Sequence, residues 1–127
     1  MKPKVLFADD DLLMRQLYRP HLERAGYVVV EAVDGAEAYQ VTLRERPNVV
    51  VMDMLMPRTD GIASIVRIKE AESTRSIPVI AISGEVKYHC LRKALRDLGI
   101  ESFLSKPFSP AKLILEIHGV HQRNARG

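Results

Sequence analysis

The stretch "NVVVMDMLMPRTDG", residues Asn48 to Gly61, places a carboxylate, Asp53, at the end of a run of apolar residues. The three valines and the first methionine predict a strand that is buried on both faces, because a half-exposed strand alternates apolar with polar side chains. Pro57, Asp60 and Gly61 follow, and these residue types are typical of turns and loops. Asp53 is therefore predicted to lie at the carboxyl end of a buried strand, where a loop towards a helix begins.

The same alternation of strand and helix patterns occurs five times along the chain. Short runs of β-branched or aromatic residues alternate with longer amphipathic segments. The predicted strands are Lys4–Ala8, Tyr27–Ala32, Asn48–Met52, Ile77–Ile82 and Glu101–Ser105, and the predicted helices are Leu12–Ala25, Ala36–Arg46, Ile62–Ala71, Val86–Leu98 and Pro110 to about His118. Strands that alternate with helices indicate parallel crossovers, and hence an α/β sheet with helices on both faces.

The polarity of the strands predicts their order in the sheet. Three strands are almost wholly apolar, as expected for central strands, whereas Tyr27–Ala32 and Glu101–Ser105 contain polar residues and are assigned to the edges. This assignment gives a five-stranded parallel sheet of order 2-1-3-4-5, which is the flavodoxin-like doubly wound (βα)5 architecture. Pro20 lies inside the first helical segment and predicts a kink there.

Length and composition limit the class of protein. A chain of 127 residues with 46% hydrophobic residues is expected to form one domain, residues 1–120, followed by a basic tail, residues 121–127, that frays. No apolar run approaches the roughly 20 residues of a membrane span, and no signal peptide is recognisable, so we expect a cytoplasmic protein without a membrane partner. The net charge of +3 is scattered along the helices, so no direct nucleic-acid partner is expected.

Polar residues follow four of the predicted strands. They are Asp9, Asp10 and Asp11 after the first strand, Asp53 after the third, Ser83 after the fourth and Lys106 after the fifth. Parallel strands end at one edge of a sheet, and ligands of open α/β sheets bind outside these ends at the topological switch point. Clustered carboxylates stay ionised together only when a cation joins them, and a site of oxygen ligands favours Mg²⁺. One carboxylate could then act as a nucleophile and become an acyl phosphate.

Four segments resemble, in order, the signature segments of the receiver domain of bacterial two-component response regulators. They are "VLFADDD", "VVVMDMLMPRTDG", "IPVIAISG" and "FLSKPF". The likeness extends over essentially the whole chain, and each segment falls at a predicted strand end. The resemblance implies a phosphoprotein of a phosphorelay, with the strand order given above, that is not an enzyme beyond its own phosphorylation and slow dephosphorylation.

The resemblance also implies roles for the residues at the strand ends. Asp53 would accept a phosphoryl group from a histidine kinase or phosphotransfer protein, and Lys106 would pair with the phosphoryl oxygens. Mg²⁺ would be bound directly by Asp10, by Asp53 and by the main-chain carbonyl of Leu55, while Asp9 would act largely through water. Because an apolar Leu55 cannot position a hydrolytic water, we expect slow loss of the phosphate.

A conformational switch is implied as well. Ser83 would turn its hydroxyl towards the phosphate, Gly84 would give the backbone freedom there, and Phe103 would change its exposure. The readout surface would be residues 86–118, which in this family dock a downstream protein, an output domain or a second receiver in a phosphorylation-dependent homodimer.

Alternatives remain for single residues and for the function. Asp11 is read as the N-cap of the following helix in preference to a metal ligand, and Asp60 with Gly61 as turn and capping residues. An aspartyl-phosphate phosphatase would want a second acid at Leu55, and a dinucleotide binder would want a glycine-rich loop where "ADDD" stands. The main alternative is a receiver-like interaction scaffold whose binding does not depend on phosphorylation.

Overall fold

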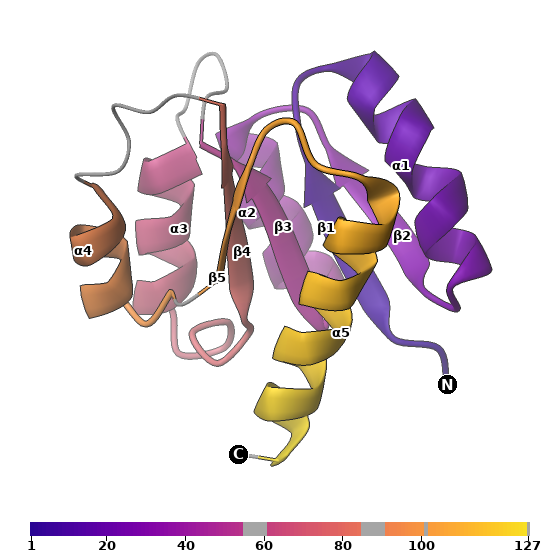
Figure 1. The fold of residues 1–127 in the computed structure, drawn as a ribbon. Coiled ribbons are helices and arrows are strands. Elements are labelled where there is room, and N and C mark those ends of the chain that lie inside the picture. The colour runs from indigo at the N-terminus through magenta and orange to yellow at the C-terminus, as the bar shows by residue number, and fades with distance from the viewer. Residues whose placement is uncertain (55–60, 85–90, 101, 127) are drawn as a thin grey trace.

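Five parallel strands form one sheet in the order β2-β1-β3-β4-β5 in this computed structural model, which describes residues 1–54, 61–84, 91–100 and 102–126 (Figure 1). The strands are β1 (Lys4–Ala8), β2 (Val28–Ala32), β3 (Val49–Asp53), β4 (Val79–Ser83) and β5 (Ser102–Ser105), and the helices are α1 (Leu12–Arg24), α2 (Gly35–Glu45), α3 (Gly61–Glu70), α4 (Leu91–Asp97) and α5 (Pro110–Arg126). The predicted flavodoxin-like (βα)5 order and the two edge strands are confirmed.

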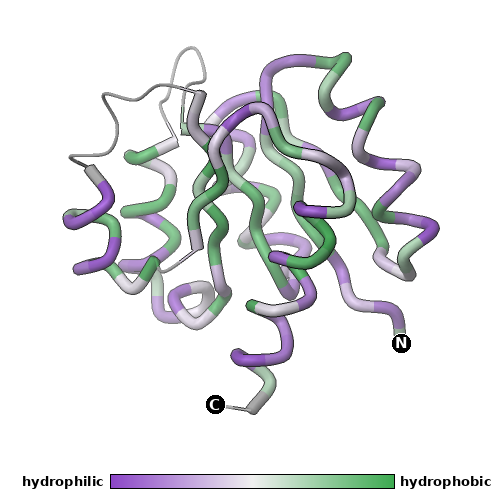
Figure 2. Tube along the Cα trace, viewed as in Figure 1, coloured by the Kyte–Doolittle hydropathy of each residue, from purple (hydrophilic) through white to green (hydrophobic). Residues whose placement is uncertain are grey.

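Each face of the sheet has its own apolar core. Alternate residues of β1 point to opposite faces, so Val5 and Phe7 pack with buried residues of α1 and α5. Leu6 and Ala8 pack on the other face with residues of α2, α3 and α4. Figure 1 shows α5 in front of the sheet and α2 behind it, and Figure 2 shows the hydrophobic central strands between these layers. Every residue of β3 is buried, which explains the apolar run that leads to Asp53.

The ends of α1 follow the sequence closely. Asp11 is its N-cap, since a side-chain oxygen accepts a hydrogen bond of 2.9 Å from the main-chain N–H of Leu13, which confirms the prediction for Asp11. The helix continues past Pro20, and the kink at this residue stays a prediction. Gly26 ends the helix with a φ of 100°, a left-handed conformation that glycine adopts without strain.

Helix α5 is longer than the sequence pattern suggested. It continues to Arg126, so the expected end near His118 was wrong. The apolar stripe that docks α5 on the sheet is formed by Leu113, Ile117 and Val120, and its last member lies beyond the expected end. The division into residues 1–120 and a fraying tail stays a prediction. Within the described ranges, no helix combines the length and apolar character needed to cross a membrane.

Gly61 allows α3 to begin against the end of β3. A Cβ atom at this position would lie 2.3 Å from the main-chain oxygen of Asp53 and 2.9 Å from the Cα atom of Met54. The first turn of α3 therefore touches the backbone that carries Asp53, and a side chain there would force the two apart. Gly61 is the first residue of the helix, and the structure adds this close approach to its predicted turn and capping role. Its partner in that reading, Asp60, lies outside the described residues.

We expect Gly61→Ala to lower the free energy of unfolding by about 1–3 kcal/mol, because the added methyl group overlaps fixed backbone atoms. Gly84→Ala is the matched control, since a Cβ there would lie 3.6 Å from the Cβ of Lys106, an ordinary contact distance. Urea denaturation of both variants measures the difference. Equal stability of the two variants would contradict this interpretation of Gly61.

Candidate functional site

The register of the sheet aligns Asp9 after β1, Asp53 at the end of β3 and Lys106 after β5. Ala8 pairs with Met52, and Asp53 pairs with Ile82, so Asp9 and Asp53 leave neighbouring strands at the same edge. Main-chain hydrogen bonds extend the ladder one residue further, from Asp9 N–H to the Ala32 carbonyl at 3.1 Å and from Lys106 N–H to the Ser83 carbonyl at 3.0 Å. The hydrogen-bonded backbone of the sheet thus fixes the Cα positions from which the side chains of Asp9, Asp53 and Lys106 extend.

Three of the predicted site residues bring their carboxylates together. One oxygen each of Asp9, Asp10 and Asp53 lies within 4.8 Å of the others. Asp9 and Asp53 are buried, whereas Asp10 is exposed, so the cluster is open to solvent on the side of Asp10. The predicted convergence of acids from two strands is present in the structure.

Asp9 is the most constrained of the three acids. Its Oδ1 atom accepts a hydrogen bond of 2.9 Å from the main-chain N–H of Asp11, while its buried Oδ2 atom has no hydrogen-bond donor in the described part of the chain. The pKa of Asp9 is raised to about 6. Burial is the main cause and the nearby charge of Asp53 adds to it, while the hydrogen bond from the Asp11 N–H acts in the opposite direction. The ionised form of Asp9 therefore needs a cation nearby.

Lys106 supplies part of that positive charge. Its Nζ atom lies 3.0 Å from Asp53 Oδ2 and 3.7 Å from Asp9 Oδ2. Burial alone would lower the pKa of the Lys106 ammonium, but the hydrogen bond to Asp53 and the surrounding carboxylates raise it above its ordinary value. Among the described residues a single ammonium faces three carboxylates, so this part of the site carries an excess of negative charge.

The donors in the cluster fit a hard divalent cation. They are carboxylate oxygens from two strands, one of them a buried oxygen without a hydrogen bond, and they carry excess negative charge. These are the properties that favour Mg²⁺ over a softer metal ion. The fourth predicted ligand, the main-chain carbonyl of Leu55, lies outside the described residues.

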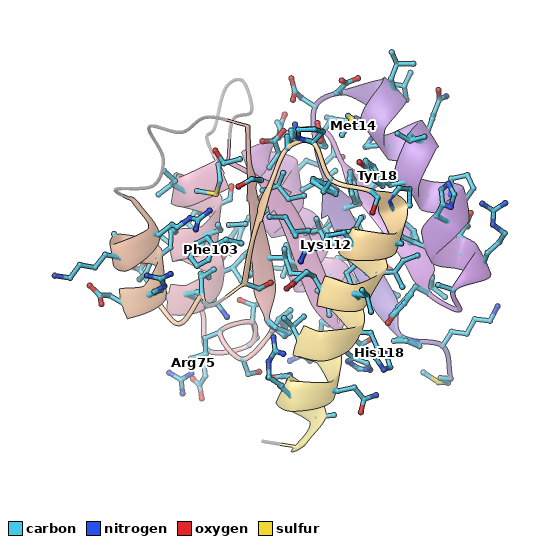
Figure 3. All side chains as sticks on the ribbon, viewed as in Figure 1. Met14, Tyr18, Arg75, Phe103, Lys112 and His118 are labelled. Carbon is cyan, nitrogen blue, oxygen red and sulfur yellow. The ribbon has the colours of Figure 1, made fainter. Side chains whose placement is uncertain are left out.

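Two further contacts position the site, and both were missed by sequence reasoning. Arg15 donates a hydrogen bond of 2.7 Å from Nη1 to the main-chain oxygen of Asp9, and its Nε atom lies 2.9 Å from Glu31 Oε1 on β2. Tyr18, labelled in Figure 3, donates from its hydroxyl to the main-chain oxygen of Phe108 at 2.5 Å, two residues after Lys106. Tyr18 and Phe108 are 90 residues apart in the chain and Arg15 and Glu31 are 16 apart, so no local pattern could have indicated these two pairings.

The three predicted switch residues lie along β4 and β5. Ser83 ends β4 and is half-buried, and Gly84 follows it beside the stem of Lys106. Phe103 lies on β5, half-buried between the sheet and α4 (Figure 3). The guanidinium groups of Arg92 and Arg96 on α4 lie 5.3 and 5.5 Å from the centre of its ring, within the range of cation–π attraction.

Comparison with known proteins decides the family. A family model described as the response regulator receiver domain matches residues 5–118. The chain belongs to this family. As a receiver, it is a module of two-component signal transduction, and the predicted family assignment is confirmed.

The receiver has relatives with similar sequences and structures. It is 34% identical over 122 residues to the probable transcriptional regulator ycf27 of Porphyridium aerugineum, covering 96% of this chain and 49% of that protein. It is 30% identical over 123 residues to the phosphate regulon transcriptional regulatory protein PhoB of Pseudomonas aeruginosa, covering 97% and 53%. The chain thus spans about half the length of these curated relatives. The solved receiver domain of the Francisella response regulator 1452 has a TM-score of 0.84 and 31% identity, covering 95% of this chain and 98% of that one.

Proposed function

We propose that this receiver accepts a phosphoryl group on Asp53 from a histidine kinase or phosphotransfer protein, in a reaction that depends on Mg²⁺. One observation carries the proposal: the buried Asp53 carboxylate lies 3.0 Å from the Lys106 ammonium and within 4.8 Å of the Asp9 and Asp10 carboxylates. A reactive carboxylate is thus surrounded by groups able to hold a divalent cation and to neutralise a phosphate.

The reaction follows from these positions. An oxygen of Asp53 attacks the phosphorus of a phosphohistidine, the bond from phosphorus to nitrogen breaks, and the bonding electrons leave with the imidazole. Lys106 neutralises negative charge on the transferred oxygens. Asp10, Asp53 and the main-chain carbonyl of Leu55 would hold Mg²⁺ directly, and Asp9 would act largely through water. When bound, the ion supplies the remaining positive charge that offsets repulsion between the carboxylates and the phosphoryl group.

Phosphorylation would then shift the population of two conformations. A phosphoryl group adds about −1.5 to −2 charge at pH 7, which favours the arrangement that brings the Ser83 hydroxyl and Lys106 towards Asp53. Gly84 would follow Ser83, and Phe103 would change its exposure. Because Arg92 and Arg96 both lie over the Phe103 ring, a change at this ring also changes its contacts with α4.

The surface of α4, β5 and α5 is the proposed readout. It would dock a downstream protein, an output domain or a second receiver, and no direct contact with nucleic acid or a membrane is proposed for it. The transcriptional regulators that match this chain extend over about twice its length, which is consistent with a separate output region in those proteins. A cytoplasmic location agrees with these partners.

Acetyl phosphate with Mg²⁺ tests the proposal. We expect intact-protein mass spectrometry to detect the addition of one phosphoryl group to the unmodified protein. No such addition is expected for an Asp53→Asn variant, or for the unmodified protein in the presence of a chelator. The receiver-like scaffold would be favoured instead if neither the unmodified protein nor Asp53→Asn changed in mass, and if partner binding were the same with and without acetyl phosphate.

Loss of the phosphate is expected to be slow, because the apolar Leu55 cannot position a water molecule for hydrolysis. We therefore expect Leu55→Asn to shorten the lifetime of the phosphorylated protein severalfold, measured by the decay of the phosphoprotein mass after removal of acetyl phosphate. A decay that is faster in the unmodified protein than in Leu55→Asn would contradict this.

A further inference from the structure

A second polar site lies at the opposite end of the sheet from Asp53. A pocket of about 350 Å³ is formed at the amino-terminal ends of β4 and β5 by the segment that follows α3, the end of α4 and the last turns of α5. Figure 1 shows α5 extending past this end of the sheet, and Figure 3 labels Arg75 there. The proposed phosphorylation chemistry uses none of these residues.

The charged side chains that the described residues contribute to the pocket are all positive. Its described lining includes Lys69, Arg75 and Arg123 and, among the residues that the structure describes, no acidic one. Arg75 and Arg123 are exposed, and across the ranges that the structure describes neither guanidinium forms an ion pair with a carboxylate. Ser76 and Asn124 add neutral hydrogen-bond donors. Ser102 also lines the cavity, but its hydroxyl donates to the Glu116 carboxylate at 2.7 Å. Three cations and two further neutral donors therefore face one cavity, and no carboxylate stands among its described lining residues.

Lys69 is held in this wall by main-chain oxygens. Its Nζ atom donates hydrogen bonds to the carbonyls of Arg75 at 3.1 Å and Ile77 at 2.6 Å. Burial lowers the pKa of Lys69, because these neutral acceptors compensate its charge only in part. An anion in the pocket would supply the missing negative charge.

The size of the cavity and the types of donor suggest the ligand. Pockets for small organic ligands measure about 300–1,000 Å³, so this cavity exceeds what one inorganic phosphate requires. Guanidinium groups match the geometry of phosphate oxygens with two parallel hydrogen bonds. We propose that the pocket binds a small phosphorylated organic anion, such as a nucleotide, with Arg75 and Arg123 as its main ligands and Lys69 as a neutralising charge.

This site depends on the part of the chain that sequence reasoning assigned to a fraying tail. Arg123 and Asn124 follow residue 118, where the match to the receiver family model ends. The continuation of α5 places them beside Arg75 and Lys69. The pocket is therefore built partly from residues outside the family match, which sets it apart from the Asp53 site.

Titration of the ¹⁵N-labelled protein with pyrophosphate and with ADP, in buffer without Mg²⁺, tests the proposal. We expect saturable amide shifts in residues 69–79, 98–100 and 120–124, with little change near Asp53. Arg75→Gln and Arg123→Gln should each weaken ADP binding by about tenfold or more, because each removes a charged hydrogen-bond donor.

Two control variants separate this site from general charge effects and from the Asp53 site. Arg24→Gln removes the same charge from an exposed position at the end of α1 and should leave ADP binding unchanged. Asp53→Asn should also bind ADP normally, because the pocket lies at the opposite end of the sheet. A receiver that does not bind ADP could therefore still be phosphorylated on Asp53, and the two proposals can fail separately. Absence of saturable shifts with both probes, or equal weakening in Arg24→Gln and Arg123→Gln, would overturn the inference.

Discussion

Asp9→Asn is expected to stabilise the metal-free receiver at pH 7 by up to about 3 kcal/mol. Burial raises the pKa of Asp9 from its ordinary 3.8 to about 6, and each pKa unit corresponds to about 1.4 kcal/mol. At pH 7 the folded protein must therefore hold an unfavourable charge at Asp9, which asparagine removes at nearly constant volume. Urea denaturation in the presence of a chelator measures the difference.

The unfavourable charge of Asp9 in the folded protein can also be measured through the pH dependence of stability. The unfolded chain releases the Asp9 proton near pH 3.8 and the folded chain near pH 6, so folding takes up protons between these values. The contribution of Asp9 to stability therefore falls as the pH rises from about 4 to about 6, and this fall should be absent in Asp9→Asn. Asp10→Asn, at the exposed member of the cluster, is the matched control. A metal-free Asp9→Asn protein that is less stable than the unmodified one at pH 7 would contradict this explanation.

Lys106→Met should have the opposite effect. Methionine keeps much of the apolar stem but removes the ammonium that lies 3.0 Å from Asp53 and 3.7 Å from Asp9, so two buried carboxylates lose their cation. Breaking a buried ion pair costs about 3–5 kcal/mol, and because Lys106 is only partly buried we expect a loss of about 1–3 kcal/mol without metal.

A double-mutant cycle separates the electrostatic part of this loss from changes in packing. Lys106→Met should destabilise the Asp9→Asn protein less than the unmodified one, since one of the two carboxylates no longer needs the ammonium. Saturating Mg²⁺ should also reduce the loss in the single variant. Strictly additive effects of the two substitutions would show that the ammonium and Asp9 do not interact.

The sheet order was predicted from the polarity of the edge strands together with the resemblance to receiver domains, whereas the acidic cluster could be predicted for a simple physical reason. Parallel strands end at the same edge, so the positions of Asp9 and Asp53 in the sequence determine that they meet in space. The N-cap role of Asp11 was equally accessible, because capping depends on a residue and its nearest neighbours.

Long-range contacts could not be predicted in the same way. The ion pair of Arg15 with Glu31 joins α1 to β2, and the hydrogen bond from Tyr18 to Phe108 joins α1 to the segment before α5. The extension of α5 did leave a local signal. Val120 continues the apolar stripe of the helix, but the polar residues that follow it were read as a tail.

Calorimetric titration of the receiver with Mg²⁺ at pH 7 tests most directly the claim that these strand-end carboxylates form a cation site. We expect one ion to bind per chain, and binding to weaken strongly in Asp10→Asn and Asp53→Asn, since each removes an anionic ligand. Absence of measurable binding to the unmodified protein, or equal binding to all three proteins, would contradict the claim and the phosphoryl chemistry that depends on it.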